Sequence, residues 1–99
     1  MKSGFQNWSD VRIFLAVCRK GSTLAASQEL GMAQPTVARR IDALEHVLEL
    51  VLFDRDNRGF RPTGAARTLL PLAESLEAAA LALAKTAEDL SRPRPIRIT

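Results

Sequence analysis

The feature that most constrains this chain is a stripe of alternating Ala and Leu in its last third. From residue 66 to residue 90, apolar residues recur at steps of three and four, with Ala at one heptad position and Leu at the other. This spacing predicts one long helix with a seam of the coiled-coil type over about 63–91. The predicted seam consists of Ala66, Leu69, Ala73, Leu76, Ala80, Leu83, Ala87 and Leu90. Thr63 is expected to cap this helix, and Pro71 to kink it.

The predicted seam is longer than the rest of the chain can cover. A helix of about 27 residues spans ~40 Å at a rise of ~1.5 Å per residue. A domain built from the remaining residues of a 99-residue chain is too small to bury a stripe of that length. We therefore expect the seam to join two copies of the chain. The alternative is that it packs on the core of its own domain.

Three shorter amphipathic segments precede the long helix, over about 9–20, 24–30 and 34–48. In the first and third segments, apolar residues recur at helical spacing and leave one polar face. Residues that begin or end helices separate the segments. These are Ser9, Ser22, Thr23 and Pro35 at the starts, and Gly21 and Gly31 at the ends. The sequence therefore predicts three consecutive helices.

The periodicity changes after residue 48. Residues 52–55 suggest a short strand, 56–59 are rich in turn formers, and 60–61 can return as a second strand before Pro62. Three helices followed by a minimal β-hairpin make a winged helix-turn-helix. The predicted fold class is thus mainly α, with this unit over 1–62 and a dimerisation helix over 63–91.

A helix of this kind fits the DNA major groove, where its first residues reach the base edges. Gln34, Pro35 and Thr36 begin the third helix, and Arg39 and Arg40 lie one turn further on. Ser22 and Thr23 begin the second helix, whose N-terminus can face a phosphate. The net charge of +3 is weak support, and 34–61 holds five basic and five acidic residues. A solvated surface is the alternative interpretation of these arginines.

Several spaced motifs resemble the N-terminal part of LysR-type transcriptional regulators. The matching stretches are Trp8 to Val17, Gly21-Ser22, Gln34-Pro35-Thr36-Val37 with Arg39 and Ile41, Leu44-Glu45, Leu52-Phe53-Asp54-Arg55, and Arg58 with Thr63-Gly64. The resemblance implies that Gln34, Pro35, Thr36, Ala38 and Arg39 contact bases. It also implies that Arg55 and Arg58 in the wing approach the backbone or minor groove of double-stranded DNA. The long helix would then pair two subunits antiparallel on a pseudo-palindromic operator, and a tetramer of the full-length protein is left open.

The chain departs from the family pattern at four positions. Ala33 and Ala38 stand where the family usually has Ser, and Leu24 stands where it has a small hydroxyl residue. These changes remove possible hydrogen bonds. Glu49 stands where a Gly usually ends the third helix, so that helix could be longer or approach the wing differently.

The remaining sequence argues against other functional classes. With a single Cys18 and a single His46, no catalytic set or metal site can be argued, and we expect no enzyme activity and no cofactor. We expect no membrane span, and a place on the bacterial nucleoid in the cytoplasm. A hinge over 92–99 would lead to a missing domain that holds any small-molecule effector. The alternatives are a protein-interaction module, which would lack salt-dependent DNA binding, and a different winged-helix family.

Overall fold

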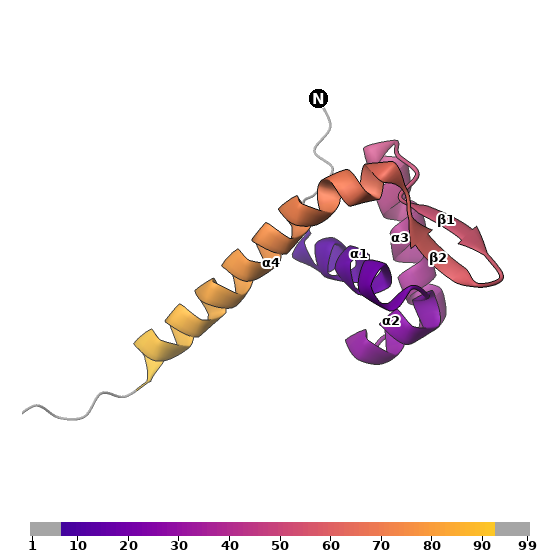
Figure 1. Cartoon of the computed structure of the whole chain (residues 1–99). Helices are drawn as coiled ribbons and strands as arrows, with labels where there is room; N and C mark the ends of the chain where they lie inside the picture. The colour runs from indigo at the N-terminus through magenta and orange to yellow at the C-terminus, as the bar shows by residue number, and fades with distance from the viewer. Residues whose placement is uncertain (1–6, 93–99) are drawn as a thin grey trace, which may run out of the picture.

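A computed structural model describes residues 7–92 of the chain. Helices α1, α2 and α3 form a compact cluster, a two-stranded hairpin projects from it, and a long helix α4 follows (Figure 1). The elements are α1 (Trp8–Lys20), α2 (Thr23–Leu30), α3 (Gln34–Leu48), β1 (Phe53–Asp56), β2 (Gly59–Pro62) and α4 (Gly64–Ser91). The predicted fold, a mainly α winged helix-turn-helix followed by a long helix, is confirmed. The hinge expected over 92–99 lies almost wholly outside the described residues.

The first two helices begin at side-chain caps. The Asn7 side chain accepts a hydrogen bond from the backbone N–H of Ser9 at 2.9 Å, so α1 begins at Trp8. The prediction that Ser9 itself caps this helix was wrong by two positions, because the Asn side-chain oxygen does the same work as a Ser hydroxyl. Ser22 caps α2 as predicted, with its hydroxyl accepting from the N–H of Ala25 at 3.0 Å.

Helix α3 has the predicted bounds, although neither end is capped by a preferred residue. Ala33 provides no side-chain hydrogen bond at the start. At the other end, Glu49 adopts φ 58°, a left-handed conformation that favours glycine. The N–H of Glu49 donates to His46 O at 3.2 Å, and the N–H of Leu50 donates to Glu45 O at 3.1 Å. Glu49 therefore ends the helix where a Gly would, and does not lengthen it.

The wing is an antiparallel hairpin that contacts the turn between α1 and α2. Phe53 pairs with Pro62 and Asp56 with Gly59, so the strands begin and end one residue away from their predicted positions. The N–H of Phe60 donates to the carbonyl of Gly21 at 2.9 Å. A Cβ at Gly59 would overlap that carbonyl, so this position requires glycine. The part of β2 next to the tip of the wing is therefore held against the turn between α1 and α2.

One apolar core joins α1 to all the other elements. The aromatic ring of Phe53 packs between those of Phe14 and Phe60, with its centroid 5.8 Å from each of theirs. Cys18 packs beside this core and is half-buried. Burial raises the pKa of its thiol to about 11, so the thiol stays protonated at neutral pH.

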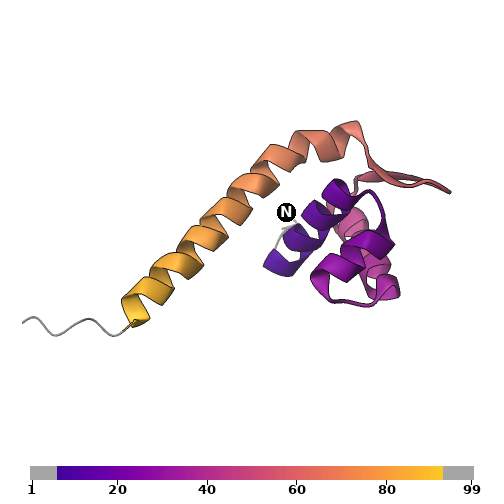
Figure 2. The ribbon, with the colours of Figure 1, turned by 60° about the horizontal axis from the view of Figure 1, so that its bottom comes forward.

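The buried residues of helix α4, Ala66 and Ala73, both lie in its first half. Thr63 caps it as predicted, and the helix continues through Pro71 without a break. Both views show its axis changing direction early in its course, as expected for a proline that removes one hydrogen bond (Figures 1 and 2). The second half extends away from the cluster. Within residues 7–92 no helix is long and apolar enough to cross a bilayer.

Candidate nucleic-acid interface

The first turns of α3 present a polar face opposite a buried one. Val37, Ile41 and Leu44 face the core and are at most 2% exposed. Gln34, Pro35 and Arg39 are exposed, and Thr36 and Ala38 are partly exposed between them. The predicted base-reading residues therefore share one accessible surface at the N-terminal end of the helix.

The start of α2 differs from the sequence-based expectation. Ser22 uses its hydroxyl to cap the helix, and Thr23 is only 6% exposed. The Thr23 hydroxyl faces α3, where it accepts a hydrogen bond from the side-chain amide nitrogen of Gln34 at 3.0 Å. Leu24 is the exposed side chain here. Thr23 therefore contacts the start of α3 through its hydroxyl, and it has little exposed surface with which to bind a phosphate.

Three of the five arginines of α3 and the wing are held by carboxylates of the same chain. Arg40 donates to Asp10 on α1 at 2.8 Å, which ties α3 to α1. Arg61 pairs with Asp56 across the hairpin at 2.8 Å. Arg55 pairs with acids of α3 and lies over the Phe60 ring, 4.8 Å from its centroid.

The other two arginines are Arg39 and Arg58. Neither forms an ion pair with any residue in the described range 7–92. Arg39 lies on the exposed face of α3, and Arg58 lies in the two-residue turn at the tip of the wing. A charge without an internal partner is available to an external anion, so these two are the strongest cationic candidates.

Glu45 organises the junction between α3 and the wing. Its Oε2 accepts from the backbone N–H groups of Leu52 and Phe53 at 2.7 and 3.2 Å. Its Oε1 accepts from Arg55 at 2.7 Å, and Asp42 binds the other end of that guanidinium at 2.7 Å. In the sequence, Glu45 is distinguished only as part of the Leu44-Glu45 stretch that matches the family pattern. Its partners are seven to ten residues away along an irregular segment, which helical spacing cannot reveal.

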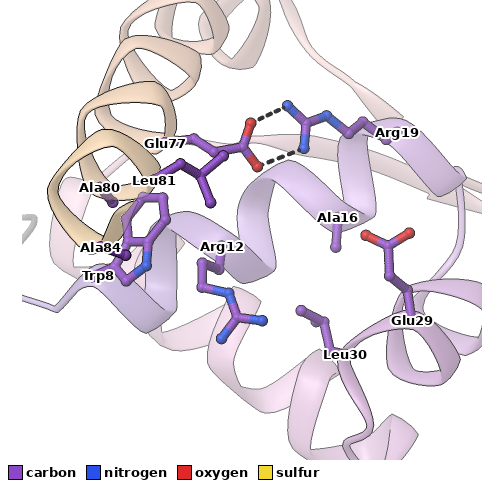
Figure 3. Close-up of a pocket in the computed structure, with 10 residues that line it drawn as sticks. All are labelled: Trp8, Arg12, Ala16, Arg19, Glu29, Leu30, Glu77, Ala80, Leu81 and Ala84. Atoms are coloured by element: carbon purple, nitrogen blue, oxygen red, sulfur yellow. Dashed lines mark hydrogen bonds and ion pairs between the residues drawn. The ribbon is translucent and has the colours of Figure 1, made fainter. Parts of the chain in front are cut away.

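A groove of about 420 Å³ lies on a different part of the molecule. Its lining residues come from α1, α2 and α4, and not from α3 or the wing (Figure 3). At its edge Arg19 donates to both carboxylate oxygens of Glu77, at 2.9 and 2.7 Å. The hydrogen bond from Arg19 lowers the pKa of Glu77, because it stabilises the charged form of the carboxylate. The groove lies where α4 is joined to α1 by the Arg19–Glu77 ion pair, and it is separate from the exposed face of α3.

A helical cluster that presents its third helix beside a basic hairpin tip defines the class of winged helix-turn-helix DNA-binding domains. Residues 8–67 match the family described as bacterial regulatory helix-turn-helix proteins of the lysR family. The chain belongs to this family, as its sequence motifs had indicated.

Individual relatives agree with this assignment. The chain is 40% identical over 90 residues to the HTH-type transcriptional regulator YofA of Bacillus velezensis, covering 90% of this chain and 31% of the relative. It is 38% identical over 94 residues to the Mau operon transcriptional activator of Paracoccus denitrificans, covering 94% of this chain and 33% of that protein. The crystal structure of a CbnR DNA-binding domain in complex with DNA superposes with a TM-score of 0.77 at 29% identity, covering 88% of this chain and all of that one. This chain therefore spans about a third of the length of these two curated relatives.

Proposed function

We propose that this chain binds double-stranded DNA with the start of α3 in the major groove and the wing tip on the adjacent backbone or minor groove. Gln34, Pro35, Thr36, Ala38 and Arg39 form the proposed base-reading surface. The N-terminus of a helix directs its free N–H groups and its positive dipole outward, which suits the polyanionic duplex. Relatives named as transcriptional regulators and a related domain solved with DNA support the same proposal.

The observation that carries this proposal is the division among the arginines. Arg40 and Arg55 are neutralised by carboxylates within the domain, whereas Arg39 and Arg58 have no acidic partner among residues 7–92. We accordingly revise the predicted contact set. Arg40 and Arg55 position α3 and the wing, and Arg39 and Arg58 meet the DNA.

We further propose that α4 joins two copies of the chain through its leucines. Leu72, Leu76, Leu83 and Leu90 are between 49% and 72% exposed in the single chain. Their steps of four, seven and seven place them along one face of the helix. Beside the first of them is an apolar hollow of about 150 Å³, lined by Val11, Leu69, Leu72, Ala73 and Leu76. A second α4 could bury this face and fill the hollow.

The alanines of the predicted seam divide differently from the leucines. Ala66 and Ala73 are 0% and 5% exposed, because they pack against the core of their own domain. The alternative of intrachain packing therefore holds for these two positions. Beyond them Ala80 is partly exposed and Ala87 is exposed. The proposed interface keeps these two alanines and Leu76, Leu83 and Leu90 of the predicted seam, and adds Leu72. It leaves Ala66 and Ala73 to the domain itself, and Leu69 is partly buried against the core.

The wider biological role follows from the family. We propose that the intact regulator acts in the bacterial cytoplasm, on the nucleoid, where a two-fold dimer presents two recognition helices to a pseudo-palindromic operator. Any effector would bind a further domain. Such roles belong to the whole regulator.

The proposed base-reading surface is tested by removing one arginine from it and one from elsewhere. Arg39→Ala should lower affinity for the preferred duplex by roughly 1–3 kcal/mol and relax its sequence preference. Arg12→Ala is the matched control, since Arg12 is also an exposed arginine but lies on α1 in the groove of Figure 3. Both affinities are measured on a preferred and a random duplex at one salt concentration. Equal losses in the two variants would reduce Arg39 to a surface charge.

A further inference from the structure

A buried hydroxyl holds one end of an exposed side chain at the proposed DNA surface. Thr23 is the first residue of α2 and is 6% exposed, whereas Gln34 is the first residue of α3 and is exposed. The Gln34 Nε2 donates to Thr23 Oγ1 at 3.0 Å. The bond joins residues eleven apart in the chain and crosses the turn between the two helices. The bond favours one orientation of a long, flexible side chain before any ligand is bound.

The bond also decides which end of the Gln34 amide is available. A glutamine amide carries two N–H donors on one branch and a carbonyl acceptor on the other. Since the nitrogen is turned inward to Thr23, the oxygen Oε1 lies on the other branch. No donor among residues 7–92 is bonded to that oxygen. The exposed start of α3 therefore offers a hydrogen-bond acceptor at this position.

The four bases differ in whether they present a hydrogen-bond donor to such an acceptor. In the major groove adenine presents an amino group at N6 and cytosine presents one at N4. Guanine and thymine present carbonyl oxygens at the corresponding places. A fixed acceptor gains a hydrogen bond from the first pair and faces an unfavourable oxygen-to-oxygen contact with the second.

We propose that Thr23 is a positioning residue for specificity: it holds Gln34 as an acceptor, and the base that Gln34 faces must carry a major-groove amino group. This inference rests on the proposed DNA binding, because it concerns how the same surface chooses its base. It also gives Thr23 a role in recognition that requires no contact between Thr23 and DNA.

The experiment begins by locating the base position that depends on Gln34. Preferred sites are selected from random duplexes with the parent chain and with Gln34→Ala, and the position at which preference disappears is identified. At that position adenine or cytosine is replaced by an analogue that lacks only the amino group. The parent should lose roughly five- to tenfold in affinity, and Gln34→Ala should be indifferent. A loss on removing the carbonyl of the opposing base instead would contradict the proposed amide orientation.

Two substitutions then separate positioning from fold. Thr23→Val keeps the shape of the buried side chain and removes the hydroxyl, whereas Thr23→Ser keeps the hydroxyl. The quantity compared is the ratio of affinities for the duplex with and without the amino group. In Thr23→Val this ratio should be less than about half of the parent's, and in Thr23→Ser it should equal the parent's. Thermal melting of both variants shows that each is folded. Parent-like discrimination by Thr23→Val would overturn the role of Thr23.

A measurement without DNA distinguishes failure of this inference from failure of the proposed function. In the free protein, the side-chain NH₂ protons of Gln34 should exchange more slowly with solvent in the parent and in Thr23→Ser than in Thr23→Val. Equal exchange in all three chains would overturn the positioning step even if DNA binds. Slow exchange in a parent chain that binds no duplex would contradict the proposed function and the specificity drawn from it, while leaving the Thr23–Gln34 bond established.

Discussion

At the scale of single residues, the internal partners of the arginines separate positioning from contact. Arg40 and Arg55 lie within three residues of the candidates Arg39 and Arg58, and all four have the same charge. Asp10, which binds Arg40, is thirty residues away in the chain. Spacing along a helix predicts which face a residue occupies, but it does not predict an acid brought in by another element. The candidate surface was therefore predictable from the sequence, and the division within it was not.

Glu49 gives a residue-scale prediction about stability. Its φ of 58° places a residue with a Cβ in a conformation that glycine adopts without strain. Its side chain is exposed, so little packing is lost when it is removed. Glu49→Gly should therefore raise the free energy of unfolding by about 0.5–1 kcal/mol.

The control for this change is Glu49→Ala, which removes the same carboxylate but keeps a Cβ. Denaturant melts of the three chains, fitted with a common slope, measure the differences. A Gly variant no more stable than the Ala variant would show that the left-handed cap stores no strain.

At the scale of elements, the helices were predicted closely because each carries a strong local signal. The bounds of α3 were predicted correctly, since its buried stripe of Val37, Ile41 and Leu44 follows helical spacing. Each strand end of the hairpin was wrong by one residue, because four-residue strands carry too little alternation to define their bounds. The attachment of the wing, through Glu45 and the Gly21 carbonyl, depends on contacts between elements and could not be predicted.

The wing gives a prediction at this scale. Arg58 lies in the turn at its tip, with no carboxylate partner among residues 7–92, so it is available to DNA phosphate. Arg58→Ala should weaken binding to all duplexes and reduce the slope of log affinity against log salt by about 0.9 per subunit. Arg61→Ala is the matched control, because Arg61 is already paired with Asp56. Unchanged slopes in the Arg58 variant would place the wing tip away from the duplex.

At the scale of the whole molecule, α4 has two different sides. One side attaches the helix to its domain through Ala66, Ala73 and the Arg19–Glu77 ion pair. The other side leaves four leucines exposed along a face with no cover from the described chain. The heptad pattern predicted a single seam for both sides, because the Ala and the Leu positions are both apolar and recur at the same spacing. The tertiary packing separates them.

Charging the leucine face should separate the proposed dimer. Leu76→Lys combined with Leu83→Lys should give a monomer in sedimentation at tens of micromolar, while the circular dichroism of the domain is retained. Leu81→Lys is the control: Leu81 is also well exposed but lies about 200° around the helix from Leu83. DNA affinity should fall in the double variant, because two linked half-site contacts become independent. A double variant that stays dimeric would place the interface elsewhere.

Selection of bound sites from random duplexes by the parent chain tests the central proposal most directly. The account predicts enrichment of two half-sites related by two-fold symmetry, with centres about 10 base pairs or a multiple of that apart. Binding to the selected duplex should weaken linearly with log salt. Failure to enrich any sequence, or an affinity for duplex that is independent of salt, would contradict the account.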